Sequence, residues 1–148
     1  MTIYLRQSTA SQEVLLPRMV DSSDGNSAES GLTIANTDIK IHKAGATTQA
    51  DKNSGGATHI SSGDYYCVLD ATDTNTLGPL VIFVHVAGAL PVRVECEVLE
   101  ANVYESLVAG TEWLEASTLR DGVAISGATI TVRKKDGSTT QYTKTGTF

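Results

Sequence analysis

The sequence predicts an all-β protein: an antiparallel β-sandwich, Ig-like or jelly-roll-like, with one short helix and a C-terminal β-hairpin. Three observations lead to this fold class. Residues 80–86 form a β-branched apolar run, apolar and charged residues alternate strictly over 92–98, and short apolar stretches recur between turns rich in Gly, Asp, Asn and Ser. A run of this length is typical of a strand covered on both faces, and strict alternation is typical of a half-buried strand.

The two stretches form a predicted hairpin around which the sandwich is organised. The second strand places Arg93, Glu95 and Glu97 on one face, and on the other it places apolar residues, namely Val92, Val94, Cys96 and Val98. The apolar face has to be covered. We therefore expect a second antiparallel sheet to pack on it.

Further strands are predicted along the chain before this hairpin. They cover residues 3–5, 14–20, 32–34, 39–41 and 65–69, which gives about seven strands up to Glu100. Pro17 cannot donate to a sheet, so the second of these strands is expected at an edge or a bulge. The polar segments 21–31, 46–56 and 71–79 are expected to be exposed loops.

The chain of 148 residues is divided by its patterns into three parts: a sandwich over 1–100, a short helix and connector over 101–114, and a hairpin extension over 115–148. Asn102 and Glu105 are a plausible cap pair for the helix, and Gly110 is its expected stop. In the extension, alternation over 128–132 and the turn Asp136-Gly137 predict the hairpin. This extension is too small and polar for a core of its own. It is therefore expected to dock on the sandwich or on a neighbouring chain.

The charge balance argues against nucleic acid as a partner. The sequence contains 11 Lys and Arg residues and 17 Asp and Glu residues, which gives a net charge of −6. Phosphate contacts need clustered cations, and the basic run 133–135 fits a solvated strand near a turn better. The first residues do not resemble a cleaved signal, and no apolar stretch approaches the length of a membrane span, so no membrane partner is expected.

The sequence offers few residues for chemistry, and we expect no catalytic residue, cofactor or metal. The histidines His42, His59 and His85 have no metal-binding spacing, and His85 is expected in the core or at an interface. Cys67 and Cys96 lie in apolar strand patterns typical of reduced core thiols, although a bridge between the sheets remains open.

Two acidic stretches could suggest a metal site. Asp21, Asp24 and Asn26 miss the spacing of a calcium loop, and Asp70, Asp73 and Asn75 form a similar cluster. Asp and Asn are ordinary turn residues because they bond to their own backbone. The sequence therefore favours plain turns at both places.

Residues 3–114 resemble a widespread group of tailed-bacteriophage virion proteins that serve as tail, tail-fibre, baseplate or neck components. The resemblance depends on the loop at 21–32, on the motif DATD at 70–73 with LG at 77–78, and on VYESL at 103–107. It implies a β-sandwich building block of the virion, made in the host cytoplasm, with no catalytic residues.

Two functions follow as hypotheses. The first is a structural virion protein that forms a homo-oligomer, a trimer or hexamer, and contacts other virion proteins. The N-terminal segment 2–7 and the extension could pair between chains, and the candidate interface residues are Tyr104, Leu107, Trp113, Leu114, Ile130, Val132 and Tyr142. Tyr104, Trp113 and Leu114 could instead cover the base of their own sandwich. The second hypothesis is a tail-fibre module whose loops bind a host glycan or protein, although the three long loops carry no aromatic residue.

Overall fold

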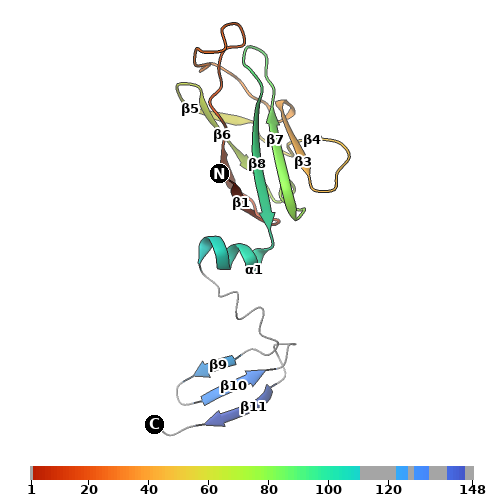
Figure 1. The fold of residues 1–148 in the computed structure, drawn as a ribbon, viewed down its shortest axis with the longest axis vertical. Helices are drawn as coiled ribbons and strands as arrows, with labels where there is room; N and C mark the ends of the chain where they lie inside the picture. Colours follow the sequence, from red (N-terminus) through yellow and green to blue (C-terminus); the bar gives the residue numbers. More distant parts are fainter. Residues whose placement is uncertain (1, 111–122, 127–128, 134–139, 146–148) are drawn as a thin grey trace. The chain divides into compact units, whose positions relative to one another are not determined.

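The computed structural model of this protein describes residues 2–110 and the strand segments 123–126, 129–133 and 140–145. The chain divides into two compact units, Met1–Ala101 and Asn102–Phe148. Figure 1 labels the strands and helices of both units. In the part of the chain that the structure describes, no helix has the length and apolar character needed to cross a bilayer.

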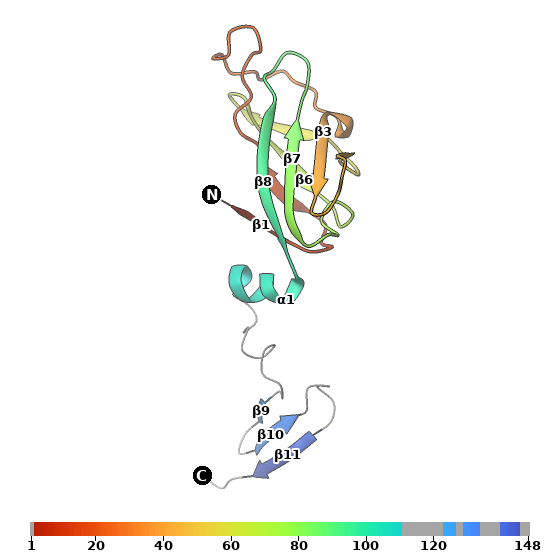
Figure 2. The same ribbon diagram turned by 45° about the vertical axis from the view of Figure 1, so that its right-hand side comes forward.

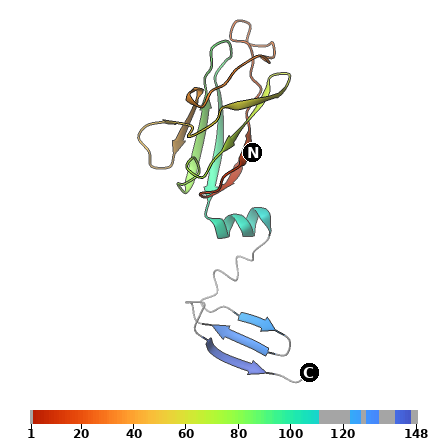
Figure 3. The ribbon, with the colours of Figure 1, turned by 180° about the vertical axis from the view of Figure 1, so that it is seen from behind.

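The first unit is a sandwich of two β-sheets, which confirms the predicted fold class. The larger sheet has the strand order β1-β8-β7-β3-β4, and the smaller has the order β2-β6-β5. Figures 1 and 3 show them from opposite sides. The strands of the larger sheet are β1 (Ile3–Arg6), β3 (Ile39–Lys43), β4 (Ala50–Asp51), β7 (Gly78–Val84) and β8 (Val92–Leu99), and those of the smaller are β2 (Gln12–Leu15), β5 (Ala57–Ser61) and β6 (Asp64–Leu69).

The predicted hairpin is present as β7 and β8, which pair antiparallel from Gly78 opposite Val98 to Val84 opposite Val92. Figure 2 shows these two strands side by side. The expectation that β7 is covered on both faces is wrong, because Leu80, Ile82 and Val84 are buried while Val81 and Phe83 are partly exposed. The second sheet covers only one face of β7. The strand is therefore apolar beyond what the core requires.

The core lies between the sheets. The larger sheet contributes Ile39, Ile82 and Val98, and the smaller contributes Val14 and Tyr65. All are nearly inaccessible to solvent because each strand directs alternate side chains inward.

Both cysteines belong to this core, as the sequence predicts. Cys67 on β6 and Cys96 on β8 are free and buried. Burial disfavours the thiolate and raises the pKa of Cys67 to about 11 and the pKa of Cys96 to about 12. The thiols are therefore packing groups, and the alternative of a bridge between the sheets does not hold.

The first two strands belong to different sheets. β1 runs parallel to β8, while β2 pairs antiparallel with β6. At the corner between them, the Gln12 side-chain amide binds the backbone of Arg6: the Arg6 backbone N–H donates to Gln12 Oε1 at 2.6 Å, and Gln12 Nε2 donates to the Arg6 carbonyl at 2.8 Å. β2 ends at Leu15, before Pro17, instead of continuing to residue 20. Met19 is nevertheless fully buried.

Two strand predictions fail around the smaller sheet. Residues 32–34 form no strand, because Ile34 makes only an isolated bridge to Ala57 as the chain crosses between sheets. Conversely, β5 was not predicted, because its residues from Thr58 to Ser61 are all exposed and show no apolar alternation. Antiparallel pairing with β6 holds this strand. A strand that buries almost nothing has no hydrophobic signal in the sequence.

A helical segment begins at the end of the first unit and consists of α1 (Ala101–Tyr104) and η2 (Glu105–Ala109). The predicted stop is confirmed, since Gly110 takes a left-handed conformation with φ of 66°. The predicted cap pair is wrong. The helix already includes Asn102, whose side-chain oxygen accepts a hydrogen bond from the Val103 N–H at 2.7 Å.

The described strands of the second unit form one antiparallel sheet of order β11-β10-β9, made of β9 (Val123–Ser126), β10 (Thr129–Arg133) and β11 (Thr140–Thr145). The predicted hairpin is present as β10 and β11. Strand β9 extends it by one strand that the sequence did not predict. The turn residues Asp136 and Gly137 lie outside the described residues.

Candidate functional site

The predicted interface residues fall in the second unit. Tyr104 is partly buried in its helix, and Leu107 is 68% exposed. Trp113 and Leu114 lie outside the described residues. The helix therefore exposes two apolar side chains, that of Leu107 and that of Val108, which is 44% exposed.

The remaining predicted interface residues lie in the second unit's sheet. Val132 is directly opposite Tyr142 of β11 and Val123 of β9, and Ile130 is opposite Ile125. Opposite residues of antiparallel strands share a face, as do every second residue along a strand. The register therefore places these five apolar positions on one face of the sheet.

The outer face of the larger sheet in the first unit is charged. Arg93 on β8 forms a salt bridge with Glu95 at 2.7 Å, and its guanidinium carbon lies 5.7 Å from the centroid of the Phe83 ring. On β3, Lys40 forms a salt bridge with Asp51. These pairs are solvent-exposed. They therefore add little stability but keep this face hydrated.

The outer face of the smaller sheet is apolar by comparison. Leu15 is 57% exposed and Val68 is 40% exposed. Leu15 lies opposite Tyr66, and Val68 lies opposite Glu13. The two faces of the sandwich thus present different chemistry to solvent.

The histidines do not form a site. His42 Nε2 lies 3.0 Å from the carbonyl of Ala46, and the His59 ring packs on Tyr65 with centroids 4.9 Å apart. His85 is exposed at the end of β7, which corrects the expectation of a core position. Among the described residues, no group of three or more His, Cys, Asp or Glu side chains could hold a metal ion.

The acidic loop after β2 is an ordinary turn, as predicted. Asp24 Oδ1 accepts hydrogen bonds from the backbone N–H groups of Asn26 and Ser27, both at 2.9 Å. The pKa of Asp24 is lowered, first by the Ser27 hydroxyl and then by these N–H groups. The carboxylate is occupied by its own loop.

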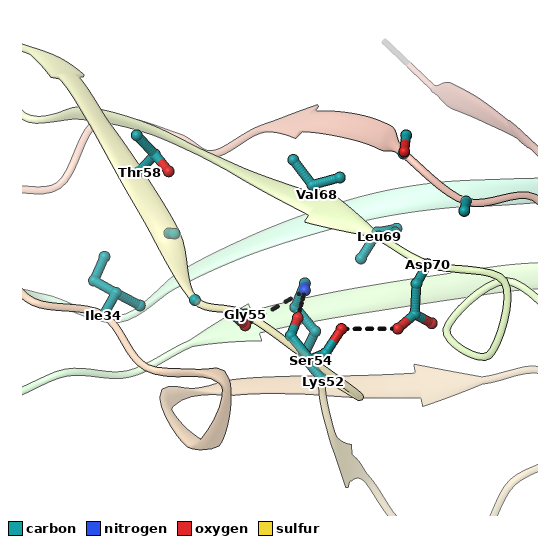
Figure 4. A pocket seen from close by; sticks show the side chains of 12 residues that line it. Ile34, Lys52, Ser54, Gly55, Thr58, Val68, Leu69 and Asp70 are labelled. Atoms are coloured by element: carbon teal, nitrogen blue, oxygen red, sulfur yellow. Dashed lines mark hydrogen bonds between the residues drawn. The ribbon is translucent and has the colours of Figure 1, made fainter.

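A hollow of about 440 Å³ lies beside the smaller sheet, and we call it the Lys52 hollow (Figure 4). Lys52 is only 2% exposed, and its ammonium group donates to the carbonyl oxygens of Ser54 and Gly55. The hydroxyl of Ser54 donates to Asp70 Oδ2 at 3.0 Å. Val68 and Thr58 also contribute to the lining. Lys52 thus fastens residues 54–55 over the core, which avoids the cost of an unpaired buried charge.

The second acidic cluster of the sequence contributes Asp70 to the lining of this hollow. Asn53 donates through its side chain to Asp70 at 2.7 Å and through its backbone to the buried Asp73 at 2.9 Å. The Asn53 amide, together with the other donors around it, lowers the pKa of Asp70 to about 2. The turn prediction is correct for Asp70 and Asp73, but the buried Lys52 was missed. Nothing in a polar loop sequence distinguishes a buried lysine from a solvated one.

A second hollow, of about 450 Å³, lies on the outer side of the larger sheet, and we call it the Phe83 pocket. Phe83, Pro91 and Val92 form its apolar part, and the polar side chains around it are those of Thr37, Asp38, Lys40, Gln49 and His85. These residues come from η1 (Asn36–Asp38), from β3, from the loop before β4, from the end of β7 and from the start of β8. No sequence motif connects them.

No family model, curated protein or solved structure matches this chain.

Proposed function

We propose that this protein is a structural component of a tailed-bacteriophage virion, in the tail, neck or baseplate, and that it acts by assembling with copies of itself and with other virion proteins. The β-sandwich and the resemblance of residues 3–114 support this proposal. The polar groups of the acidic turns and of the Lys52 hollow also support it, because their internal hydrogen bonds hold loops in place.

The observation that carries the proposal is the mainly apolar face of the second unit's sheet. Its register places Val123, Ile125, Ile130, Val132 and Tyr142 on this face, together with one charged residue, Lys144. A sheet of three short strands is stable only when its apolar face is covered. The same faces of further copies provide this cover when they pack against one another around the axis of a closed ring, since homo-oligomers usually have closed symmetry. The exposed Leu107 adds a further apolar contact.

Light scattering coupled to size-exclusion chromatography tests the assembly. We expect a mass three or six times that of the 15.6 kDa chain. Ile130→Asp should dissociate the oligomer, because it places a charge at the proposed contact. Thr131→Asp, at the next position on the opposite face, is the matched control and should leave the mass unchanged. A monomeric wild-type protein, or an Ile130→Asp variant of unchanged mass, would contradict the proposal.

Deletion of residues 127–148 is a coarser test of the same idea. It should abolish assembly while the first unit keeps its cooperative unfolding, measured by circular dichroism. Mass spectrometry of purified phage particles then tests the virion assignment. A chain that is absent from the particles would contradict it, and a monomer that binds host cells would favour the host-binding alternative.

A further inference from the structure

The Phe83 pocket differs from the Lys52 hollow in how much of its hydrogen-bonding capacity is already used. Within the described residues, the side chains of Thr37, Gln49 and His85 make no hydrogen bond. Asp38 uses one carboxylate oxygen, which accepts from the Ala35 N–H at 2.8 Å. In the Lys52 hollow, by contrast, the ammonium group and Asp70 are both engaged internally. Free polar groups around a pocket are groups that a ligand can use.

The ion pairs around the pocket leave the Asp38 carboxylate without an ionic partner among the described residues. Lys40 is paired with Asp51, and Arg93, next to the Phe83 ring, is paired with Glu95. The Asp38 carboxylate would repel an anionic ligand, whereas a neutral ligand avoids that cost. The pocket therefore favours a neutral ligand over an anionic one.

The pocket lining combines apolar residues with polar side chains. Phe83, Pro91 and Val92 offer an apolar surface, while Thr37, Gln49 and His85 can each both donate and accept hydrogen bonds. A sugar ring has a C–H face that packs on apolar and aromatic groups and hydroxyls that both donate and accept. The volume of the pocket, about 450 Å³, is also suitable, since small-molecule sites start at about 300 Å³.

We propose that the Phe83 pocket binds one neutral monosaccharide unit, with its C–H face against Phe83 and Pro91 and its hydroxyls toward Asp38, Gln49 and His85. This site is independent of the assembly function proposed above. A free sugar and the end of a longer glycan share this chemistry, so the test uses both.

The test is a titration of the ¹⁵N-labelled full chain followed by NMR, with D-glucose, D-galactose, D-mannose and N-acetyl-D-glucosamine as probes. At least one should cause saturable shifts at the amides around Lys40, Gln49 and His85, with a dissociation constant on the order of 1 mM. Methyl glycosides of the same sugars represent the glycan end and should bind with similar affinity. The anionic analogue glucuronate should bind more weakly than D-glucose, because the Asp38 carboxylate repels it.

Variants identify the pocket. Gln49→Ala, in an exposed loop, should weaken binding about fivefold by removing one hydrogen-bonding group. Phe83→Leu should weaken it further by removing the aromatic surface. Thr58→Ala in the Lys52 hollow is the matched control and should not change the affinity.

Three results would overturn the proposal: no saturable shift with any probe up to about 50 mM, shifts confined to the Lys52 hollow, or an affinity unchanged in both Gln49→Ala and Phe83→Leu. Thermal unfolding of each variant checks that it is folded. The oligomeric mass should be the same with and without sugar, so a failure here is distinct from a failure of the assembly proposal.

Discussion

The Lys52 hollow and the Phe83 pocket are almost equal in volume, at about 440 and 450 Å³, yet they are built differently. In the first, the buried Lys52 and the partly exposed Asp70 form hydrogen bonds with the loop that forms the wall. In the second, the side chains of Gln49 and His85 are exposed and make no hydrogen bond within the described residues. The same kinds of polar side chain can therefore either stabilise the fold through internal hydrogen bonds or remain available to a ligand. Changes in the first hollow should therefore cost stability, and changes in the second should not.

Gly56→Ala should have the largest effect, because Gly56 forms the wall of the Lys52 hollow. A Cβ atom at this position would lie 1.7 Å from the carbonyl oxygen of Ile34, which is rigid backbone. Relieving the clash should cost about 3 kcal/mol of the free energy of unfolding. Urea denaturation measures this loss. Gly31→Ala is the control, since a Cβ there meets nothing within 4 Å, and equal stabilities of the two variants would refute the close approach.

Tyr65→Phe should have the next largest effect. The Tyr65 hydroxyl accepts from the Leu32 N–H at 3.1 Å and donates to the Glu29 carbonyl at 3.2 Å, which holds the segment leading to Ile34. Its removal leaves both groups without this partner and should cost about 1 to 2 kcal/mol in thermal or urea unfolding. Tyr66→Phe, on the outer face of the same strand, should change stability little. A similar loss in both variants would show that the hydroxyl of Tyr65 is not the cause.

The lowered pKa of Asp70 should make the stability of the protein depend on pH. Its pKa is lowered from 3.8 to about 2 in the folded protein, so the unfolded chain binds a proton more readily than the folded one. The stabilisation is therefore present above pH 3.8 and is lost as the pH falls toward 2. Because solvent screens this group, we expect an effect below about 1 kcal/mol.

Asp70→Asn should flatten the stability curve between pH 4 and 2, measured by urea denaturation at several pH values. Asp64→Asn is the control, because this carboxylate accepts no side-chain hydrogen bond among the described residues. A curve for Asp70→Asn as steep as that of the wild type would show that Asp70 does not cause the loss of stability at low pH.

His85→Ala and Gln49→Ala should have the smallest effect on stability, within about 0.5 kcal/mol of the wild type, as is usual for exposed side chains. This result would complete the contrast, because the same two residues should matter for sugar binding. A loss of 2 kcal/mol or more in either variant, measured by thermal unfolding, would mean that the Phe83 pocket is also held together by its polar groups.

The fold was largely predictable where burial follows the chain periodicity. The alternation over residues 92–98 predicted β8, and the inward positions Tyr65, Cys67 and Leu69 predicted β6. The acidic turns were also predictable, because Asp24 bonds to residues two and three positions ahead of it. In each case the determining contacts are local or repeat with a fixed period.

Predictions failed where the deciding partner is distant in the sequence. Ile34 forms a bridge with Ala57 in place of a strand, and β1 joins the larger sheet through parallel pairing with β8. His85 is exposed because the apolar run it follows is covered on one face only. The local pattern of the sequence shows no sign of these features, because each depends on a partner distant in the chain.

The acidic charge, the all-β fold class and the place of both cysteines in apolar strands could be predicted from the order of residues, because alternation of apolar residues specifies strands regardless of their partners. The tertiary structure alone decided that Lys52 is buried and that Phe83, Gln49 and His85 surround one pocket. The physical reason is that burial and pocket formation depend on which strands become neighbours. That pairing joins residues more than 30 positions apart, as Gln49 and Phe83 are, and leaves no trace in the order of the residues between them.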